Sequence, residues 1–207
     1  MNKRNFAKDL QASFIKRLSG WELYKKNAIY RCTLDFVQWI VFETSRFNDA
    51  VVPVYSIQAL ANQFSEIDLS LGNRVCKNDG VDYWITPNEW VENEANIVDR
   101  VIQQVKPNPV EMLDPISVQK FLLNFREEHE NLYLAKAIAE IALGNHESGQ
   151  KFLEKSLQKL QKIPYPWART EEERVQKWRH STQSELLSVI REDAKKGKHL
   201  LNLNLNV

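Results

Sequence analysis

The chain has 207 residues, of which 43% are hydrophobic, and its 28 Lys and Arg residues nearly balance its 27 Asp and Glu residues. This length and apolar content suffice for one large or two small domains, and the two cysteines are too few for a disulfide scaffold or a zinc ribbon. No uninterrupted apolar run approaches the roughly 20 residues that span a bilayer, and an amphipathic pattern follows the charged start, so we expect no membrane partner and a cytoplasmic location.

The first predicted element is an amphipathic helix over residues 5–18. Its apolar residues recur at four-residue spacing, at Phe6, Leu10, Phe14 and Leu18. Ser19-Gly20 provides a helix stop, and we expect the helix to lie on a sheet. Basic side chains cover its remaining surface, but no base-stacking aromatic residues are interleaved with them, so we expect a solvated face and no nucleic-acid partner.

Three strand-like runs follow in close succession, at residues 28–36, 37–47 and 51–60. In the middle run apolar side chains fall on both parities, which is typical of a central strand covered on both faces. The first run alternates apolar and polar residues, as a strand nearer the edge would. Arg46-Phe47-Asn48-Asp49 offers the short polar turn of a hairpin. We predict an α+β fold, with an antiparallel β-sheet packed by the N-terminal helix and followed by an all-helical C-terminal half.

This region also resembles a known family. The features that carry the resemblance are Gly20-Trp21 after the first helix, Tyr30-Arg31 in one strand, and Gln38 in a strand that ends near Ser45. On these features residues 6–60, and more loosely the chain up to residue 100, resemble the bacterial domain of unknown function 4304. The resemblance implies an α+β fold and, because that family has no assigned activity, no reaction. The long helical extension of this chain departs from the family.

A second, smaller hairpin and a helix come next. Asp79-Gly80 lies between two short strand-like runs and readily takes the positive φ angles of a tight turn. Thr86, Pro87 and Glu89 then combine a cap, a first-turn proline and a capping-box acid, and apolar residues continue at helical spacing. These residues predict the start of a helix.

The predicted domain boundary lies at residues 106–112, where Pro107 and Pro109 end the helical periodicity. It separates an α+β sheet domain, residues 1–106, from a helical domain, residues 113–207. In the second domain Asp114-Pro115 opens a helix. Further helices are predicted near residues 131–143, 147–163 and 171–195, the last capped by Thr170.

Part of the helical half resembles a tetratricopeptide unit. Six residues lie where such a helical hairpin places its aromatic, small and packing residues: Tyr133, Ala137, Gly144, Gly149, Leu153 and Ser156. Any helical hairpin needs small residues at a close crossing and a turn between its helices. A hairpin of another origin is therefore the favoured interpretation.

The last seven residues alternate Leu and Asn strictly up to Val207, after the basic stretch of residues 195–198. This pattern predicts a break in the helix and then a strand. A strand of this length needs a neighbour, so we expect it to join an edge of the chain's own sheet. Pairing with a second copy and a flexible terminus are the alternatives.

The motifs of common reactions are absent from the sequence. It contains no glycine-rich phosphate loop, HExxH, nucleophile elbow or Cys-x-x-Cys pair. His129 lies among glutamates, but adjacent residues point in different directions on a helix, which favours a solvated charged turn over a metal site. We predict no catalytic residue, no metal and no cofactor.

A ligand site over the sheet is the best alternative that the sequence offers. Asp35, Glu43 and Arg46 gather polar groups at the ends of the predicted strands, and Trp39 and Trp84 add aromatic walls. The predicted ligand-binding residues are Trp39, Glu43, Arg46 and Trp84. Carboxylates become catalytic only when burial and proximity separate their pKa values, so a structural ion pair with Arg31 or Arg46 is the favoured interpretation of these polar groups.

The leading hypothesis is therefore a non-catalytic cytosolic protein that binds another protein, as an accessory or immunity-type factor in bacteria. It depends on the absence of reaction motifs and on a helical half able to present grooves. The competing hypothesis is a small-molecule-binding or hydrolytic enzyme with its site near Trp39, Glu43 and Arg46. A nucleic-acid binder ranks third, and no pattern in the sequence indicates an oligomeric state.

Overall fold

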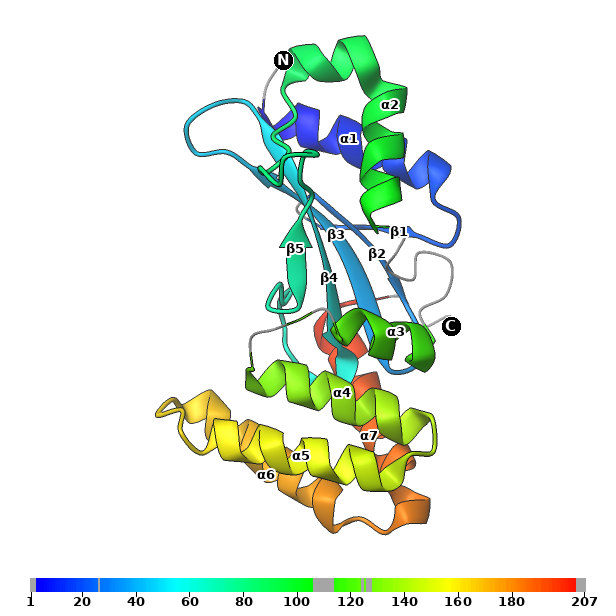
Figure 1. Ribbon diagram of the computed structural model, residues 1–207, viewed down its shortest axis with the longest axis vertical. Coiled ribbons are helices and arrows are strands. Elements are labelled where there is room, and N and C mark those ends of the chain that lie inside the picture. The colour runs from blue at the N-terminus through cyan, green and yellow to red at the C-terminus, as the bar shows by residue number, and fades with distance from the viewer. Residues whose placement is uncertain (1–2, 26, 106–113, 124, 126–127, 204–207) are drawn as a thin grey trace. The chain divides into compact units, whose positions relative to one another are not determined.

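The computed structural model describes residues 3–25, 27–105, 114–123, 125 and 128–203 (Figure 1). An N-terminal helix precedes a five-stranded antiparallel sheet, and six helices follow the sheet, which confirms the predicted fold class. The elements in chain order are α1 (Lys3–Arg17), β1 (Glu22–Tyr24), β2 (Ala28–Cys32), β3 (Phe36–Thr44), β4 (Val51–Ala59), η1 (Leu60–Asn62), β5 (Gly72–Arg74), α2 (Pro87–Val105), α3 (Pro115–Leu122), α4 (Glu130–Ala142), α5 (His146–Leu160), α6 (Pro166–His180) and α7 (Gln183–Leu200).

The chain divides into two compact units. Unit 1 comprises Met1–Arg31, Gln38–Ile57 and Gly72–Glu111, and unit 2 comprises Cys32–Val37, Gln58–Leu71 and Met112–Val207. Unit 2 therefore contains the β2–β3 turn and η1, whereas the sequence prediction assigned both to a domain of residues 1–106. The predicted linker at residues 106–112 lies outside the described residues.

The sheet is the predicted meander, with the strand order β1-β2-β3-β4-β5. β3 is the central strand, and its residues from Phe36 to Ile40 are all buried, which explains why apolar side chains fall on both of its parities. β2 pairs with the edge strand β1, with Glu22 opposite Tyr30. The predicted turn between β3 and β4 is closed by the Ser45 backbone N–H, which donates to the Ala50 carbonyl oxygen at 2.9 Å.

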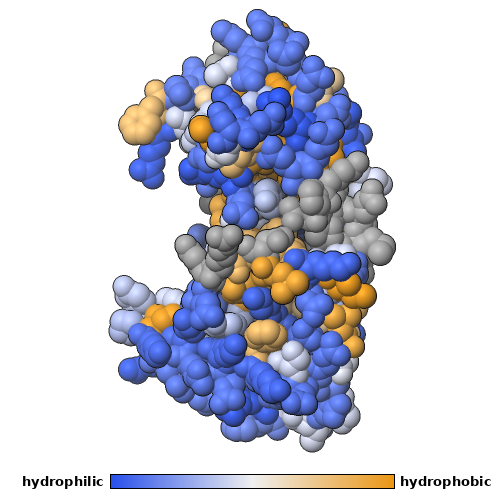
Figure 2. Space-filling model, in the orientation of Figure 1, coloured by the Kyte–Doolittle hydropathy of each residue, from blue (hydrophilic) through white to orange (hydrophobic). Residues whose placement is uncertain are grey.

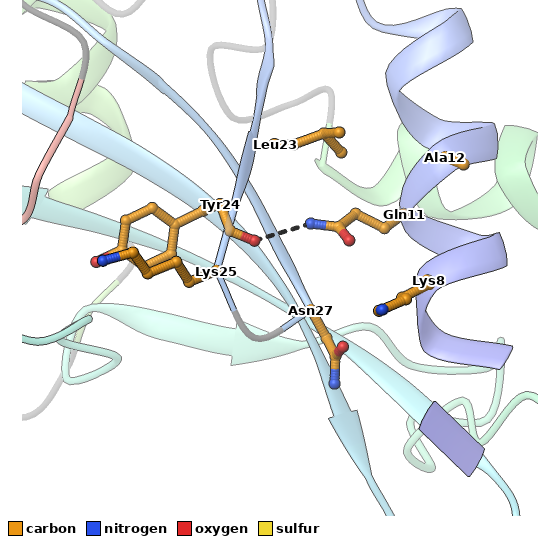
Figure 3. Close-up of a pocket in the computed structure, with 7 residues that line it drawn as sticks. All are labelled: Lys8, Gln11, Ala12, Leu23, Tyr24, Lys25 and Asn27. Carbon is orange, nitrogen blue, oxygen red and sulfur yellow. Dashed lines mark hydrogen bonds between the residues drawn. The ribbon is translucent and has the colours of Figure 1, made fainter. Parts of the chain in front are cut away.

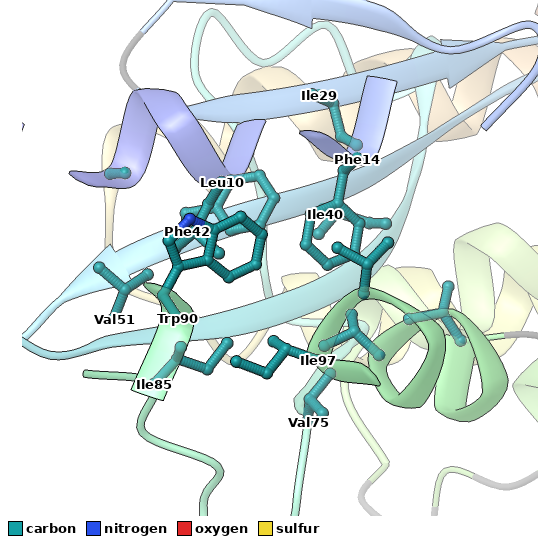
Figure 4. Close-up of a cluster of buried hydrophobic side chains, with 14 of the residues drawn as sticks. Leu10, Phe14, Ile29, Ile40, Phe42, Val51, Val75, Ile85, Trp90 and Ile97 are labelled. Atoms are coloured by element: carbon teal, nitrogen blue, oxygen red, sulfur yellow. The ribbon is translucent and has the colours of Figure 1, made fainter. Parts of the chain in front are cut away.

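The core of unit 1 lies between one face of the sheet and helices α1 and α2 (Figure 4). Leu10 and Phe14 of α1 point toward Ile40 and Phe42 of β3, and the rings of Phe14 and Phe42 are 5.3 Å apart between centroids. Trp90 of α2 completes the same cluster. The prediction that the first helix packs on the sheet is confirmed.

The second hairpin and the start of α2 form as their residues predict. Gly80 has a φ of +82°, and the Lys77 N–H donates to the Val81 carbonyl oxygen at 2.7 Å across the turn. The Thr86 hydroxyl oxygen accepts a hydrogen bond from the Glu89 N–H at 3.2 Å and so caps the helix. α2 then bends at a non-helical residue, Asn93 (φ −138°).

In unit 2, α4 is the central helix, because all its described residues from Asn131 to Ile141 except Lys136 are buried. α5 packs against it as the predicted helical hairpin. Gly149 lies at the close approach of the two helices, where a Cβ atom would be 2.5 Å from Ile141 Cγ1.

The prediction of a single helix over residues 171–195 is wrong. α6 begins at Pro166, with Thr170 inside it and not at its cap, and it ends before Ser181, whose backbone is extended (φ −70°, ψ 146°). Proline at the first helical position fixes φ, which explains the earlier start. The apolar spacing continues through the break because both helices have buried side chains, such as Trp178 of α6 and Ile190 of α7.

The predicted helix break at residues 195–198 and the strand that starts at residue 201 are also wrong for the described residues. α7 continues to Leu200, and the Leu201 N–H donates to the Gly197 carbonyl oxygen at 3.0 Å. Leu201 and Leu203 are buried at the end of this helix and are not part of a strand. Residues 204–207 lie outside the described residues.

Candidate functional site

The predicted ligand-binding residues lie in different surroundings. Trp39 is completely buried in β3, where its ring meets Tyr24 in an edge-on contact with centroids 4.9 Å apart. Arg46 is exposed in the β3–β4 turn and has no hydrogen bond or ion pair to another described residue. The structure therefore makes Trp39 part of the packed interior and Arg46 part of a surface turn.

Glu43 and Trp84 do meet, through a residue that the sequence reasoning missed. Arg74 Nη2 lies 3.1 Å from Glu43 Oε2, its Nη1 lies 2.8 Å from Asp82 Oδ2, and its guanidinium carbon lies 5.7 Å from the centre of the Trp84 ring. The hydrogen bonds to Asp82 and then Glu43 raise the pKa of Arg74. Arg74 is exposed, Glu43 and Asp82 are half-buried, and both acids already pair with the arginine. The cluster is therefore an ion-pair network at the surface, whose charged groups are already paired and would gain little by binding a ligand.

A pocket of about 750 Å³ lies beside α1 and the β1–β2 hairpin (Figure 3). Gln11 points across it from α1, and its amide Nε2 donates to the carbonyl oxygen of Tyr24 at 3.0 Å and also to that of Ala28. The side-chain amide is thus committed to the backbone of the hairpin. The Gln11 hydrogen bonds fix α1 to β1 and β2, so a structural role explains these pocket residues better than a ligand site does.

A groove of about 810 Å³ in unit 2 has a different character. It follows one face of α7, and Leu34 of the β2–β3 turn forms part of its wall. We call it the α7 groove, and its lining residues are Leu34, Ser184, Leu187, Ser188, Arg191, Glu192, Lys195, Lys198 and His199. The helical residues recur three or four positions apart, so they share one face of α7. Three of the lining side chains are cationic and one is a carboxylate.

Arg191 is held in place by Asp35 of the β2–β3 turn. Its Nε lies 3.2 Å from Asp35 Oδ1 and its Nη2 lies 3.4 Å from Oδ2, which is the two-pronged geometry that arginine favours with carboxylates. Asp35 is only 5% exposed, and the Thr33 hydroxyl oxygen accepts a hydrogen bond from its N–H at 3.4 Å. The predicted partner of Asp35, Arg31 or Arg46, is therefore wrong: Asp35 pairs with Arg191 of α7, while Arg31 Nε donates to Gln38 Oε1 at 3.0 Å.

Lys198 is the unusual residue of the α7 groove. It is only 4% exposed, and its ammonium group has no hydrogen bond and no ion pair within the described part of the chain. Lys196, two residues before it, is by contrast exposed and lies 2.8 Å from Asp193 Oδ1, and this hydrogen bond raises the pKa of Lys196. The Nζ of Lys198 is not a fully buried atom, so the ammonium group reaches the solvent of the groove, where an anionic ligand can approach it.

The position of Lys198 follows from the residue before it. Gly197 lets α7 approach η1 so closely that a Cβ atom at this position would be 1.8 Å from the Leu60 carbonyl oxygen. The groove face could have been recognised from the spacing of Arg191, Lys195 and Lys198 on a helix. The predicted helix break at residues 195–198 separates Lys198 from Arg191, so the shared helix face was not predicted.

Metal ligands do not gather among the described residues, where no three His, Cys, Asp or Glu side chains cluster. His129 is the N-cap of α4, and its Nδ1 accepts a hydrogen bond from the Leu132 N–H at 3.4 Å. Comparison of the chain with family models, with curated proteins and with solved structures found no match. The resemblances to the domain of unknown function 4304 and to a tetratricopeptide unit stay predictions.

Proposed function

We propose that the protein is a non-catalytic binding protein whose α7 groove receives an acidic segment of a partner protein. The observation that carries this proposal is the side chain of Lys198, which lines the groove, is only 4% exposed, and has no acceptor for its ammonium group among the described residues. Its stem is buried while its ammonium group reaches the solvent of the groove. A carboxylate of the partner can form a charge-assisted hydrogen bond with this ammonium group, which is stronger than a hydrogen bond between neutral groups.

The shape and composition of the groove favour a chain segment as the ligand. Its lining runs from Ser184 to His199, a distance of about 22 Å at the helical rise of 1.5 Å per residue. An extended peptide of about seven residues covers that distance. Leu34 and Leu187 offer apolar contacts, while Lys195 and Lys198 offer positive charge, so the fitting segment combines acidic and apolar side chains.

The groups that line the groove do not form a nucleophile and base. The Ser184 hydroxyl oxygen is 3.1 Å from the Thr182 hydroxyl oxygen, and no hydrogen bond joins a groove serine to His199 in the part of the chain that the structure describes. Nucleophilic catalysis needs such a pair within hydrogen-bond reach. This supports binding as the function of the groove.

The proposal can be tested by NMR titration of the uniformly 15N-labelled protein with a synthetic peptide of about eight residues, rich in Glu and Leu, whose length follows from the groove. We expect shifts at Leu34, Leu187, Arg191 and Lys198, and none with a peptide in which Lys replaces Glu. Lys198→Met should weaken binding at least tenfold, because a hydrogen bond to a charged group contributes about 1.5–3 kcal/mol.

The matched control is Lys120→Met, which removes an exposed lysine of α3 in the same unit. It should leave the affinity for the acidic peptide unchanged. Shifts confined to unit 1, or equal affinities of Lys198→Met and the wild type, would contradict the assignment of the α7 groove as the binding site.

A further inference from the structure

The connection between α5 and α6 exposes an unusual amount of apolar surface. We call residues 163–167, Ile163-Pro164-Tyr165-Pro166-Trp167, the aromatic tip. Tyr165 is 60% exposed and Trp167 is 45% exposed. Each such side chain buries 150–250 Å² when it is covered, so aromatic residues dominate the energetics of interfaces. The connection lies at one end of the α5–α6 hairpin, where Figure 2 shows pale and orange surface among blue neighbours.

The aromatic tip is held by hydrogen bonds on both sides. The Ile163 N–H donates to the Leu160 carbonyl oxygen at 2.9 Å, and the Ala168 N–H donates to the Tyr165 carbonyl oxygen at 3.0 Å. Gln161 Nε2 also donates to Glu172 Oε1 at 3.0 Å, which joins the end of α5 to α6. Two prolines restrict φ within the tip. The exposed rings are therefore presented with little conformational entropy left to lose on binding.

Basic side chains outnumber acidic ones around the aromatic tip. Residues 155–174 include five basic and three acidic side chains. Lys155, Lys162 and Arg169 have no ion pair within the described chain, while Lys159 lies 3.9 Å from Glu128. Among the acids, Glu171 pairs with Arg174, and Glu172 accepts hydrogen bonds from the amides of Gln161 and Gln176 and forms no ion pair with a described residue.

From these observations we infer that the aromatic tip docks on an anionic lipid surface. Tyr and Trp at a projecting turn fit the interfacial layer of a bilayer, where one end of the ring is apolar and the other is wet. Each Lys or Arg near an anionic leaflet adds attraction. A single-stranded nucleic acid would use the same residue types, but it needs a basic groove that follows its backbone, whereas these residues lie on a projecting turn.

This contact would be peripheral, because none of the described helices is long and apolar enough to cross a membrane. It differs from the expectation, drawn from the sequence, that no membrane is a partner. That expectation rested on the absence of a spanning run, and a surface contact needs only a few exposed aromatic and basic side chains.

Co-sedimentation with large unilamellar vesicles tests the inference. The full chain should bind vesicles made of equal parts phosphatidylcholine and phosphatidylglycerol, bind phosphatidylcholine vesicles much more weakly, and lose binding as salt is raised. Replacing both rings, by Tyr165→Ala with Trp167→Ala, should lower the partition coefficient at least tenfold. Lys162→Gln should lower it about fivefold, since one cation near the surface is removed.

Two variants separate docking from misfolding and from the α7 groove. Trp167→Phe keeps an aromatic ring, so it should retain vesicle binding. Brominated lipid should quench the tryptophan fluorescence of this variant less than that of the wild type, because Trp167 is the tryptophan that would contact the lipid. Phe47→Ala removes a 97% exposed ring from unit 1 and should change nothing, and Lys198→Met should also leave vesicle binding intact. Equal binding by the double variant and the wild type, or retention by single-stranded oligothymidine without vesicle binding, would overturn the inference.

Discussion

Replacing Gly197 by alanine should destabilise unit 2 although alanine is the better helix former. Gly197 lies inside α7, at the point where that helix crosses η1. An added Cβ atom would be 1.8 Å from the Leu60 carbonyl oxygen and 2.8 Å from its carbonyl carbon. Both are backbone atoms, so no change of rotamer relieves the overlap. The two segments would have to separate by about 1.6 Å to reach the 3.4 Å of ordinary contact.

Two effects of opposite sign decide the magnitude. In a helix interior Gly→Ala gains about 1 kcal/mol from backbone entropy and solvation. Overpacking typically costs about 1–3 kcal/mol, and a collision with the backbone belongs at the upper end of that range. We therefore expect Gly197→Ala to lower the free energy of unfolding of unit 2 by about 2 kcal/mol.

Gly149→Ala is the matched control, because it is also a helical glycine of unit 2. Its added Cβ atom would be 2.5 Å from Ile141 Cγ1, an atom of a side chain that can rotate away. Its change in stability should thus lie within about 1 kcal/mol of zero, since the helix-propensity gain offsets a smaller strain. Urea unfolding followed by hydrogen exchange of the α7 amides reports on unit 2 itself. An unchanged or raised stability of Gly197→Ala would refute the close crossing of α7 and η1.

Three further changes have defined outcomes. Trp39→Ala should lower the free energy of unfolding by about 3–5 kcal/mol in chemical denaturation, because it empties a fully buried site; an unchanged midpoint and slope would mean that the residue is exposed. Burial, followed by the hydrogen bond that the Tyr83 hydroxyl donates to Glu89, raises the pKa of Tyr83 from 10.0 to about 12. The protonated Tyr83 hydroxyl stabilises the folded state fully below pH 10.0, and this stabilisation is lost as pH rises to about 12. The stability advantage of the wild type over Tyr83→Phe should therefore shrink between these values in urea titrations. Lys198→Met should leave the unfolding free energy within about 1 kcal/mol of the wild type in the same assay, because methionine replaces the buried stem, while weakening binding of the acidic peptide at least tenfold; a larger loss of stability would show that the ammonium group already has a partner.

The features that the sequence predicts correctly depend on neighbours along the chain. Apolar residues on both parities around Trp39 indicate a central strand, the hairpin turns follow from residues such as Asp79-Gly80, and Thr86 caps α2 through a residue three positions away. Each of these signals is complete within a few residues. No distant contact is needed to interpret them.

The features that it does not predict depend on contacts between distant segments. Gly197 has the composition of a helix stop, and only the position of Leu60 makes it a crossing residue inside α7. Asp35 could pair with any arginine near the sheet, and its partner Arg191 lies 156 residues away in sequence. The same limit affects the site, because the surroundings of Trp39 and Lys198 follow from the packing of several elements.

Gly197 explains why the side chain of Lys198 is buried. With no side chain at Gly197, the last turns of α7 lie closer to the η1 backbone than any other residue would allow, and residue 198 is carried inward with them. Lys195, on the same face one turn earlier, stays exposed. The methylene stem of Lys198 gives the packing that a methionine would give, and its ammonium group, which reaches the solvent of the groove, adds nothing to that packing. Because the charge does not serve the packing, the proposed acidic ligand of the α7 groove gives it a role.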